Sequence, residues 1–239
     1  MTERQTHILL AVISEFVETA FPVGSQVIVE KYKVKASPAT IRNEMVELTE
    51  MGFLAKSHFS AGRVPTYLGF RYYIDRLMEE ESVNYMEEVE MRQELHRRRF
   101  QKDKLIKCAV DVLSDSLKYA SIALADDSVF YSGISEMLDY QEFQDIDNLR
   151  SILTIIENAV TLDRIFKKAF SDSDTKVLVG SEAGFNAFEP CALVYSEFTV
   201  YQGQQGYIGV IGPMRMLYSH VIPRVRFMAE TLSVVTRGW

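Results

Sequence analysis

Cysteine and histidine are scarce in this chain of 239 residues, with two and four copies respectively. Cys108 and Cys191 lie far apart, and neither belongs to a CxxC motif or has a histidine at metal-ligand spacing. We predict that both are small, buried hydrophobic residues. The histidines are equally scattered, and no glycine-rich phosphate loop or pair of nucleophile and base can be assembled. We therefore expect no enzyme, no metal and no cofactor.

Long apolar runs are also missing. No stretch approaches the roughly 20 consecutive apolar residues that span a bilayer. Glu3 and Arg4 lie at the start, and Glu15 interrupts the apolar stretch that follows, so the pattern does not fit a secretory signal. We expect a cytoplasmic protein with no membrane partner. With 47% hydrophobic residues, the chain can bury a sizeable core, which its length would divide between two domains.

Positively charged residues are also fewer than negatively charged ones, which gives a net charge of −7. Residues 1–77 carry a formal charge of +1, residues 78–104 carry −2 and residues 105–239 carry −6. Binding of DNA by the weakly basic N-terminal part would require a focused patch and would show only a modest salt dependence. The candidate cations for such a patch are Lys31, Lys33, Lys35, Arg42, Lys56 and Arg63.

The most informative segment that is present runs from Ala36 to Met45. Ser37 is a favoured N-cap residue, and Pro38 follows at the first helical position, where its missing N–H costs nothing. One face of the predicted helix is apolar, with residues at helical spacing: Ile41, Met45 and Leu48. This pattern predicts a capped helix with one buried face.

The other face of that helix carries the chemistry for reading DNA. Ala39, Arg42 and Asn43 point away from the apolar face, and Thr40 lies at its edge. Arginine binds guanine with a bidentate fork, and asparagine binds adenine in the same way. A capped helix with small residues followed by Arg42 and Asn43 is typical of a recognition helix.

The flanking patterns complete a known motif. Helices are predicted over residues 2–19 and 25–32, and a turn at 33–36 leads into the third helix, which Gly52 ends. This is the order of a helix-turn-helix.

After Gly52 the spacing of apolar residues changes from that of a helix to that of a strand. Residues 53–59 are strand-like, residues 60–65 form a turn with one exposed arginine, and residues 66–77 form an amphipathic helix. A strand and a basic turn after the third helix make a wing, whose cations would meet phosphates or the minor groove: Lys56, His58 and Arg63. We interpret residues 1–77 as a winged helix-turn-helix domain. The alternative is a protein-interaction module in which Arg42 and Asn43 are merely solvated.

Residues 78–104 are dense in both charges and contain neither proline nor glycine, which is typical of a solvated connecting helix. The Arg97–Arg99 run either touches phosphate or belongs to a charged helix face. Residues 105–239 then form a second domain, with helices predicted at 105–117, 149–166 and 219–235 and strands at 120–125, 129–131, 176–179, 192–200 and 207–211. An antiparallel sheet with helices gathered on one side is an α+β fold, of the type used by small-molecule sensors.

Taken together, these residues resemble the bacterial heat-inducible transcription repressor (HrcA) family along nearly the whole chain. Three blocks carry the resemblance: Ser37 to Met45; Ser60 to Thr66 with Gly69 to Tyr73; and Gly209 to Met216 with Tyr218. The resemblance implies a winged helix-turn-helix followed by a GAF-like α+β domain. It assigns Ser37, Ala39, Thr40, Arg42 and Asn43 to base reading or the groove, and Lys56, His58 and Arg63 to the wing.

The resemblance also implies partners. It predicts a homodimer that represses chaperonin and Hsp70-type operons by binding an inverted repeat in double-stranded DNA. Activity would depend on the chaperonin, which heat diverts to unfolded protein, so that the operons open.

One departure from the family bears on the dimer. Family members carry a dimerisation insertion in the second domain, whereas this chain has only the short turn at residues 126–128. An inverted repeat requires a two-fold protein, so the helix of residues 78–104 or an open sheet edge would have to supply the contact. The alternative function is a metabolite-responsive winged-helix regulator that binds a ligand in its GAF-like domain.

Overall fold

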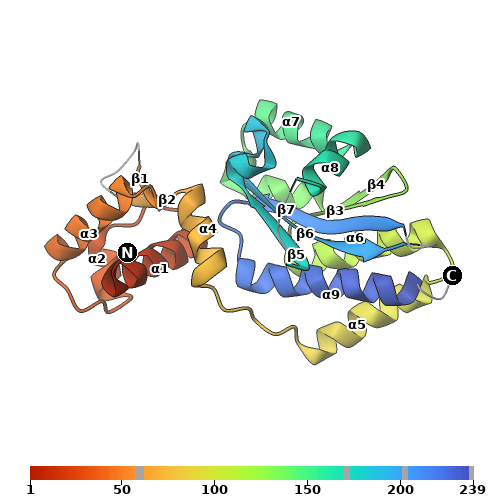
Figure 1. Cartoon of the computed structure of the whole chain (residues 1–239), viewed down its shortest axis with the longest axis horizontal. Helices are drawn as coiled ribbons and strands as arrows, with labels where there is room; N and C mark the ends of the chain where they lie inside the picture. Colours follow the sequence, from red (N-terminus) through yellow and green to blue (C-terminus); the bar gives the residue numbers. More distant parts are fainter. Residues whose placement is uncertain (58–61, 169–172, 201–203, 237–239) are drawn as a thin grey trace. The chain divides into compact units, whose positions relative to one another are not determined.

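The structure is a computed structural model that describes residues 1–57, 62–168, 173–200 and 204–236. The chain divides into two compact units, Met1–Glu79 and Glu80–Trp239, and each is described by itself (Figure 1). Within the described residues, no helix has the length and the apolar character needed to cross a membrane.

The first unit is helical with a small hairpin (Figure 1). Its elements are α1 (Glu3–Thr19), α2 (Ser25–Glu30), α3 (Pro38–Glu50), β1 (Leu54–Lys56), β2 (Arg63–Pro65) and α4 (Tyr67–Arg76). The core comes from the apolar faces that the periodicity predicts, including Ile8, Leu9, Val12, Ile41, Leu48 and Phe70. Within the described residues, the strand predicted over 53–59 is limited to β1.

Helix α4 closes this unit over the hairpin. Thr66 caps the helix by accepting from the Gly69 amide at 3.1 Å, and its hydroxyl donates to the Gly52 carbonyl at 2.6 Å. Gly69 itself lies against the Phe53 carbonyl, with no room there for a Cβ atom. A side chain at this position would push α4 away from β1.

The second unit is built on a sheet of five antiparallel strands among the described residues, in the order β4-β3-β7-β6-β5. Its strands are β3 (Ala120–Ala125), β4 (Ser128–Ser132), β5 (Thr175–Val179), β6 (Cys191–Thr199) and β7 (Gln205–Pro213). Its helices are α5 (Tyr85–Arg97), α6 (Lys102–Leu117), α7 (Ile146–Ile156), α8 (Ala159–Phe166) and α9 (Tyr218–Thr236), with short 3-10 turns over Ile134–Asp139, Gln141–Phe143, Gly180–Ala183 and Asn186–Phe188. The mixed helix and antiparallel-sheet class predicted from the sequence is confirmed.

The prediction that the helices gather on one side of the sheet is wrong. Helices α6 and α9 cover one face, whereas α7 and α8 cover the other (Figure 1). Every residue of β3 is accordingly buried. Because both faces are covered, β3 is almost continuously apolar rather than alternating, with Ser121 as its one polar residue.

Residues 78–104 also differ from the prediction. The helix is present as α5, but it is packed rather than solvated, since Met91 and Leu95 are buried and α5 lies against α6 and α9. Three carboxylates of this segment bind α9. Glu80 pairs with Arg226 at 2.7 Å, Glu81 accepts from the Ser219 hydroxyl at 3.1 Å, and Glu87 pairs with Arg224 at 2.6 Å.

The turn between β3 and β4 is as tight as predicted. Ala125 lies opposite Ser128, and Asp126 and Asp127 between them have positive φ values of 46° and 59°. Two residues in the left-handed region match the twist of a hairpin. The helix predicted over residues 149–166 is interrupted, because Asn158 caps a new helix, α8, by accepting from the Thr161 amide.

Candidate nucleic-acid interface

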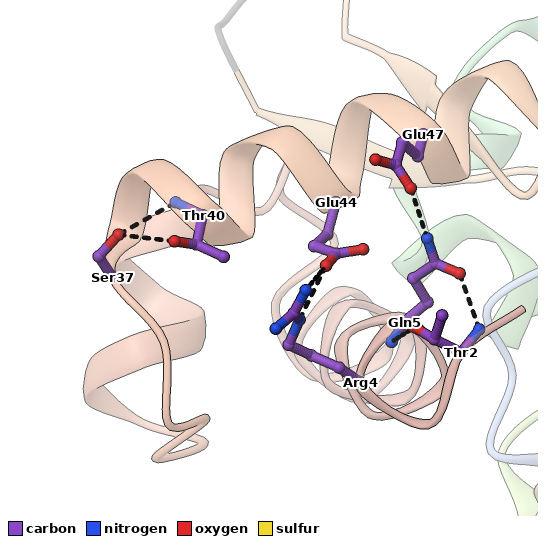
Figure 2. Close-up of polar contacts among 7 residues, drawn as sticks. All are labelled: Thr2, Arg4, Gln5, Ser37, Thr40, Glu44 and Glu47. Atoms are coloured by element: carbon purple, nitrogen blue, oxygen red, sulfur yellow. Dashed lines mark hydrogen bonds and ion pairs between the residues drawn. The ribbon is translucent and has the colours of Figure 1, made fainter.

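The N-terminus of α3 is built around Ser37. Its Oγ accepts a hydrogen bond from the Thr40 amide at 3.1 Å and lies 2.9 Å from the Thr40 hydroxyl oxygen (Figure 2). Pro38 occupies the first helical position. The two hydroxyls thus complete the cap, and they fix where the first turn of α3 begins.

The burial pattern predicted for α3 is confirmed. Ile41, Met45 and Leu48 are buried, and Thr40 is half-buried at the edge. Ala39, Arg42 and Asn43 are exposed, and among the described residues neither Arg42 nor Asn43 has a hydrogen-bond or ion-pair partner. The helix therefore presents a cation and an amide that are available to a ligand.

Polar contacts that the sequence patterns did not predict anchor α3 to α1. Glu44 is only 7% exposed, and it pairs with Arg4, whose Nε lies 2.8 Å from the carboxylate (Figure 2). One turn further along, Glu47 accepts from the side-chain amide of Gln5 at 2.7 Å (Figure 2). These contacts set the rotation of α3 on α1, and with it the direction in which Arg42 and Asn43 point.

Lys31 does not join the predicted basic patch. Its ammonium lies 2.7 Å from Glu15 and 2.6 Å from Glu18, both on α1. Hydrogen bonds to the two carboxylates raise the pKa of Lys31. Its charge is therefore neutralised within the unit. By contrast, Lys33 and Lys35 are exposed, and they line a hollow of about 560 Å³ together with Arg4 and His7.

The hairpin holds two of the three predicted wing cations in the described residues, and His58 lies outside them. Lys56 on β1 is exposed and stands opposite Arg63 on β2. Arg63 was predicted in an exposed turn, but it is half-buried in a strand, and its Nε donates to the Thr49 hydroxyl at 3.2 Å. Its backbone also pairs with Val23, with N–O distances of 2.8 and 2.9 Å.

Arg42 on α3 and Arg63 on β2 line the same hollow of about 100 Å³, beside Ser25 at the start of α2. Arginine suits a phosphate because it presents several donors in a rigid fork. Sequence spacing did not suggest that these two residues lie at one hollow.

An aromatic cluster lies in the core of the second unit. On the sheet face beneath α8, Phe166 packs against Tyr195 and Tyr207, with ring centroids 4.8 Å apart in both pairs. The Tyr195 hydroxyl donates to the Phe166 carbonyl at 2.7 Å. These aromatic side chains form part of the buried core between α8 and the sheet.

The two cysteines are buried as predicted. Cys108 is 6% exposed and Cys191 is fully buried, and burial raises the pKa of both thiols. Among the described residues, no group of three or more histidine, cysteine or acidic side chains is arranged to hold a metal ion.

Comparison with known proteins agrees with the resemblance found in the sequence. Two curated relatives named heat-inducible transcription repressor HrcA, from Pelotomaculum thermopropionicum and Carboxydothermus hydrogenoformans, are each 25% identical to this chain. Each alignment covers 98% of this chain and 97% of the relative. The alignments extend over 336 and 334 positions, more than the 239 residues of this chain, so both relatives contain residues that this chain lacks.

A solved structure and a family model complete the comparison. A crystal structure of a hypothetical protein at 2.2 Å resolution superposes with a TM-score of 0.79 at 15% identity, covering 100% of this chain and 99% of the other. At that identity the likeness shows the fold alone. The model of the HrcA protein C-terminal domain matches residues 71–222. Since this match includes more than half of the chain, the protein belongs to the HrcA family.

Proposed function

We propose that this protein is a transcription repressor of heat-shock operons that binds DNA through a winged helix-turn-helix. Residues 1–77 would form the DNA-binding domain, with α2 and α3 as the helix pair and β1 and β2 as the wing. Membership of the HrcA family supports a repressor rather than an enzyme, as does the name that the two relatives share.

The observation that carries the proposal is the face of α3 that bears Arg42 and Asn43. Both side chains are exposed and have no partner among the described residues, whereas Glu44, which is buried on the other side of the helix, is held by Arg4 of α1. In the major groove, Arg42 would read guanine and Asn43 would read adenine. Ala39 and Thr40 would let the start of the helix approach the base edges.

The remaining site residues would hold the phosphate backbone. Ser37 would orient the first turn of α3 at the groove, and Arg63 would share one phosphate with Arg42 at the hollow that they line. Lys56 and His58 would contact the flanking backbone from the wing. In this proposal Arg63 serves at the base of the hairpin rather than at its tip.

We further propose that the second unit contains the GAF-like domain, over residues 105–239, preceded by the helical segment 78–104. The resemblance supports an inverted-repeat operator upstream of chaperonin and Hsp70-type genes, a homodimer that matches its two-fold symmetry, and control by the chaperonin. Heat would then draw the chaperonin to unfolded protein and lower the amount of active repressor.

Fluorescence anisotropy tests the proposal. A duplex with the chaperone-operon inverted repeat is compared with a scrambled duplex of equal length across a salt series. We expect selective binding that saturates at two chains per duplex, with a modest salt slope because the first unit is only weakly basic. Equal and weak binding to both duplexes would contradict the repressor assignment.

A further inference from the structure

The second unit has a groove of about 710 Å³ between α5 and α9. Its lining includes Arg92, His96, Arg97, Phe227, Glu230 and Val234. Phe227 forms an apolar floor that is 8% exposed, and the Arg92 guanidinium lies 5.0 Å from the centre of its ring. The groove thus has an apolar base with cations along its α5 side.

The α9 wall of this groove is an exposed ridge. Glu230 and Val234 are four residues apart and therefore lie on one side of the helix. Val234 is 66% exposed and lines the groove, so it extends the apolar surface of Phe227 to the outside of α9. The outward side of α5 is also apolar near its ends, where Met86 is 63% exposed and Phe100, just beyond the helix, is 78% exposed.

We propose that a second copy of this chain docks on this surface, with the Glu230–Val234 ridge of each copy seated in the α5–α9 groove of the other. The inference rests on the proposed function, because an inverted-repeat operator requires two protein chains related by a two-fold axis. A two-fold contact uses one patch twice, so the patch must contain both the ridge and its groove. This surface does, and ridges that pack into grooves are the usual geometry of helix contacts.

Charge favours a second copy over another occupant. Each ridge carries one carboxylate, Glu230, and each groove presents Arg92 and Arg97 on α5. Those arginines pair with Glu88 and Glu94 on the same helix, and exposed pairs of this kind are weak enough to exchange partners. Glu230 of one copy can therefore pair with the arginines of the other, and the two-fold axis repeats this contact so that it forms twice.

The first experiment measures the oligomeric state of the full chain without DNA, by sedimentation velocity over a range of concentrations. Val234→Glu places a charge on the ridge and should weaken the dimer at least tenfold. Val160→Glu is the matched control, because Val160 is 63% exposed on α8, which covers the opposite face of the sheet. Val160→Glu should remain as dimeric as the wild type. A monomeric wild type, or equal effects of the two substitutions, would overturn the proposal.

Charge reversal provides a second measurement. Glu230→Arg should weaken the dimer, because two arginines would then face one another, and so should Arg97→Glu. Combining the two substitutions should recover most of the lost affinity, since each reversed ridge would face a reversed groove. A double variant that is weaker than either single variant would show that Glu230 does not face α5 of a second copy, and would overturn the proposed seating.

A DNA measurement separates this proposal from the proposed function. Val234→Glu should bind a duplex with a single half-site as tightly as the wild type does, because the first unit is unchanged, and it should lose tight binding to the full inverted repeat. If instead the wild type is a dimer that Val234→Glu dissociates, yet neither binds operator DNA selectively, the docking surface stands and the repressor assignment is wrong.

Discussion

Helices α3 and α5 have the same length, thirteen residues, and similar packed sides. Each holds a carboxylate that an arginine from another helix neutralises. Glu44 on α3 pairs with Arg4, and Glu87 on α5 pairs with Arg224. In both cases the ion pair fixes the rotation of the helix on its neighbour. The packed sides of α3 and α5 therefore do not show which helix could bind a ligand.

Their outward sides differ. On α5, Arg92 pairs with Glu88 at 3.3 Å, and Glu94 pairs with both Arg97 and Arg98. On α3, Arg42 has no partner among the described residues. The cation on α3 is thus without a carboxylate partner in the described part of the chain, whereas these cations of α5 lie in exposed ion pairs with carboxylates one turn away on the same helix.

The largest effect is expected from breaking the packed side of α5. Arg224 is buried, and it donates to the two oxygens of Glu87 at 2.7 and 2.6 Å. Arg224→Ala would leave the Glu87 carboxylate with only the Ser116 hydroxyl and no cation, and the free energy of unfolding should fall by about 3 kcal/mol. Urea unfolding measures this change. Arg98→Ala is the control on the outward side of the same helix, and a comparable loss there would contradict the distinction.

The outward side of α3 should matter for DNA rather than for stability. Arg42→Ala should cost about 1–3 kcal/mol of operator binding and relax discrimination at one base position. Anisotropy against operator duplexes substituted at single positions measures both effects. Arg98→Ala again serves as the control and should bind like the wild type. If the scrambled duplex loses as much affinity as the operator, Arg42 contacts only phosphate.

The packed side of α3 should affect both properties. Arg4→Ala leaves the carboxylate of Glu44 buried without its partner, which should destabilise the first unit by about 1–2 kcal/mol. Because the rotation of α3 would loosen, operator binding should weaken while the salt slope stays the same. Arg4→Lys should recover part of both losses. A variant that loses stability but keeps full selectivity for the operator would show that Arg4 does not orient α3.

The Glu87 pair also predicts a pH dependence. Burial acts to raise the pKa of Glu87, but hydrogen bonds from Arg224 and Ser116 prevail and lower it below its ordinary value of 4.5. The unfolded chain therefore takes up this proton at a higher pH than the folded one. The stabilisation is complete above pH 4.5 and is lost as the pH falls through the folded pKa.

Replacement of the carboxylate should remove this dependence. Glu87→Gln should cost about 1 kcal/mol at neutral pH, because the amide keeps one acceptor oxygen for Arg224 or Ser116 but loses the other acceptor and the charge. Chemical unfolding at a series of pH values should show a shallower fall of stability below pH 4.5 than in the wild type. Parallel curves for the two proteins would mean that another carboxylate dominates the acid range.

The smallest effect is expected from a single wing cation. Lys56→Ala should weaken binding to all duplexes equally and lower the salt slope by about 0.9. Lys31→Ala is the matched control, because Lys31 is bound to Glu15 and Glu18 and should not touch phosphate. An unchanged slope for Lys56→Ala, or an equal change for both variants, would remove the wing from the interface.

Local sequence patterns were sufficient to predict several of the helices, caps and turns. The cap at Ser37, the buried face through Ile41 and Leu48, and the hairpin at Asp126 and Asp127 all follow from interactions within a few residues of the chain. Helical periodicity and turn chemistry act at that range, so the sequence alone predicts them. It also predicted which face of α3 is exposed, which is the basis of the proposed function.

Contacts between distant residues were decided only by the tertiary structure. The pairing of Arg4 with Glu44, the hollow that Arg42 and Arg63 share, and the packing of α5 on α9 each join elements that no local pattern links. The same holds for Lys31, whose charge is visible in the sequence but whose neutralisation by α1 is not. Whether a charged side chain is available to a ligand depends on which opposite charge folding brings within hydrogen-bond distance, and that neighbour is chosen by the packing of whole helices.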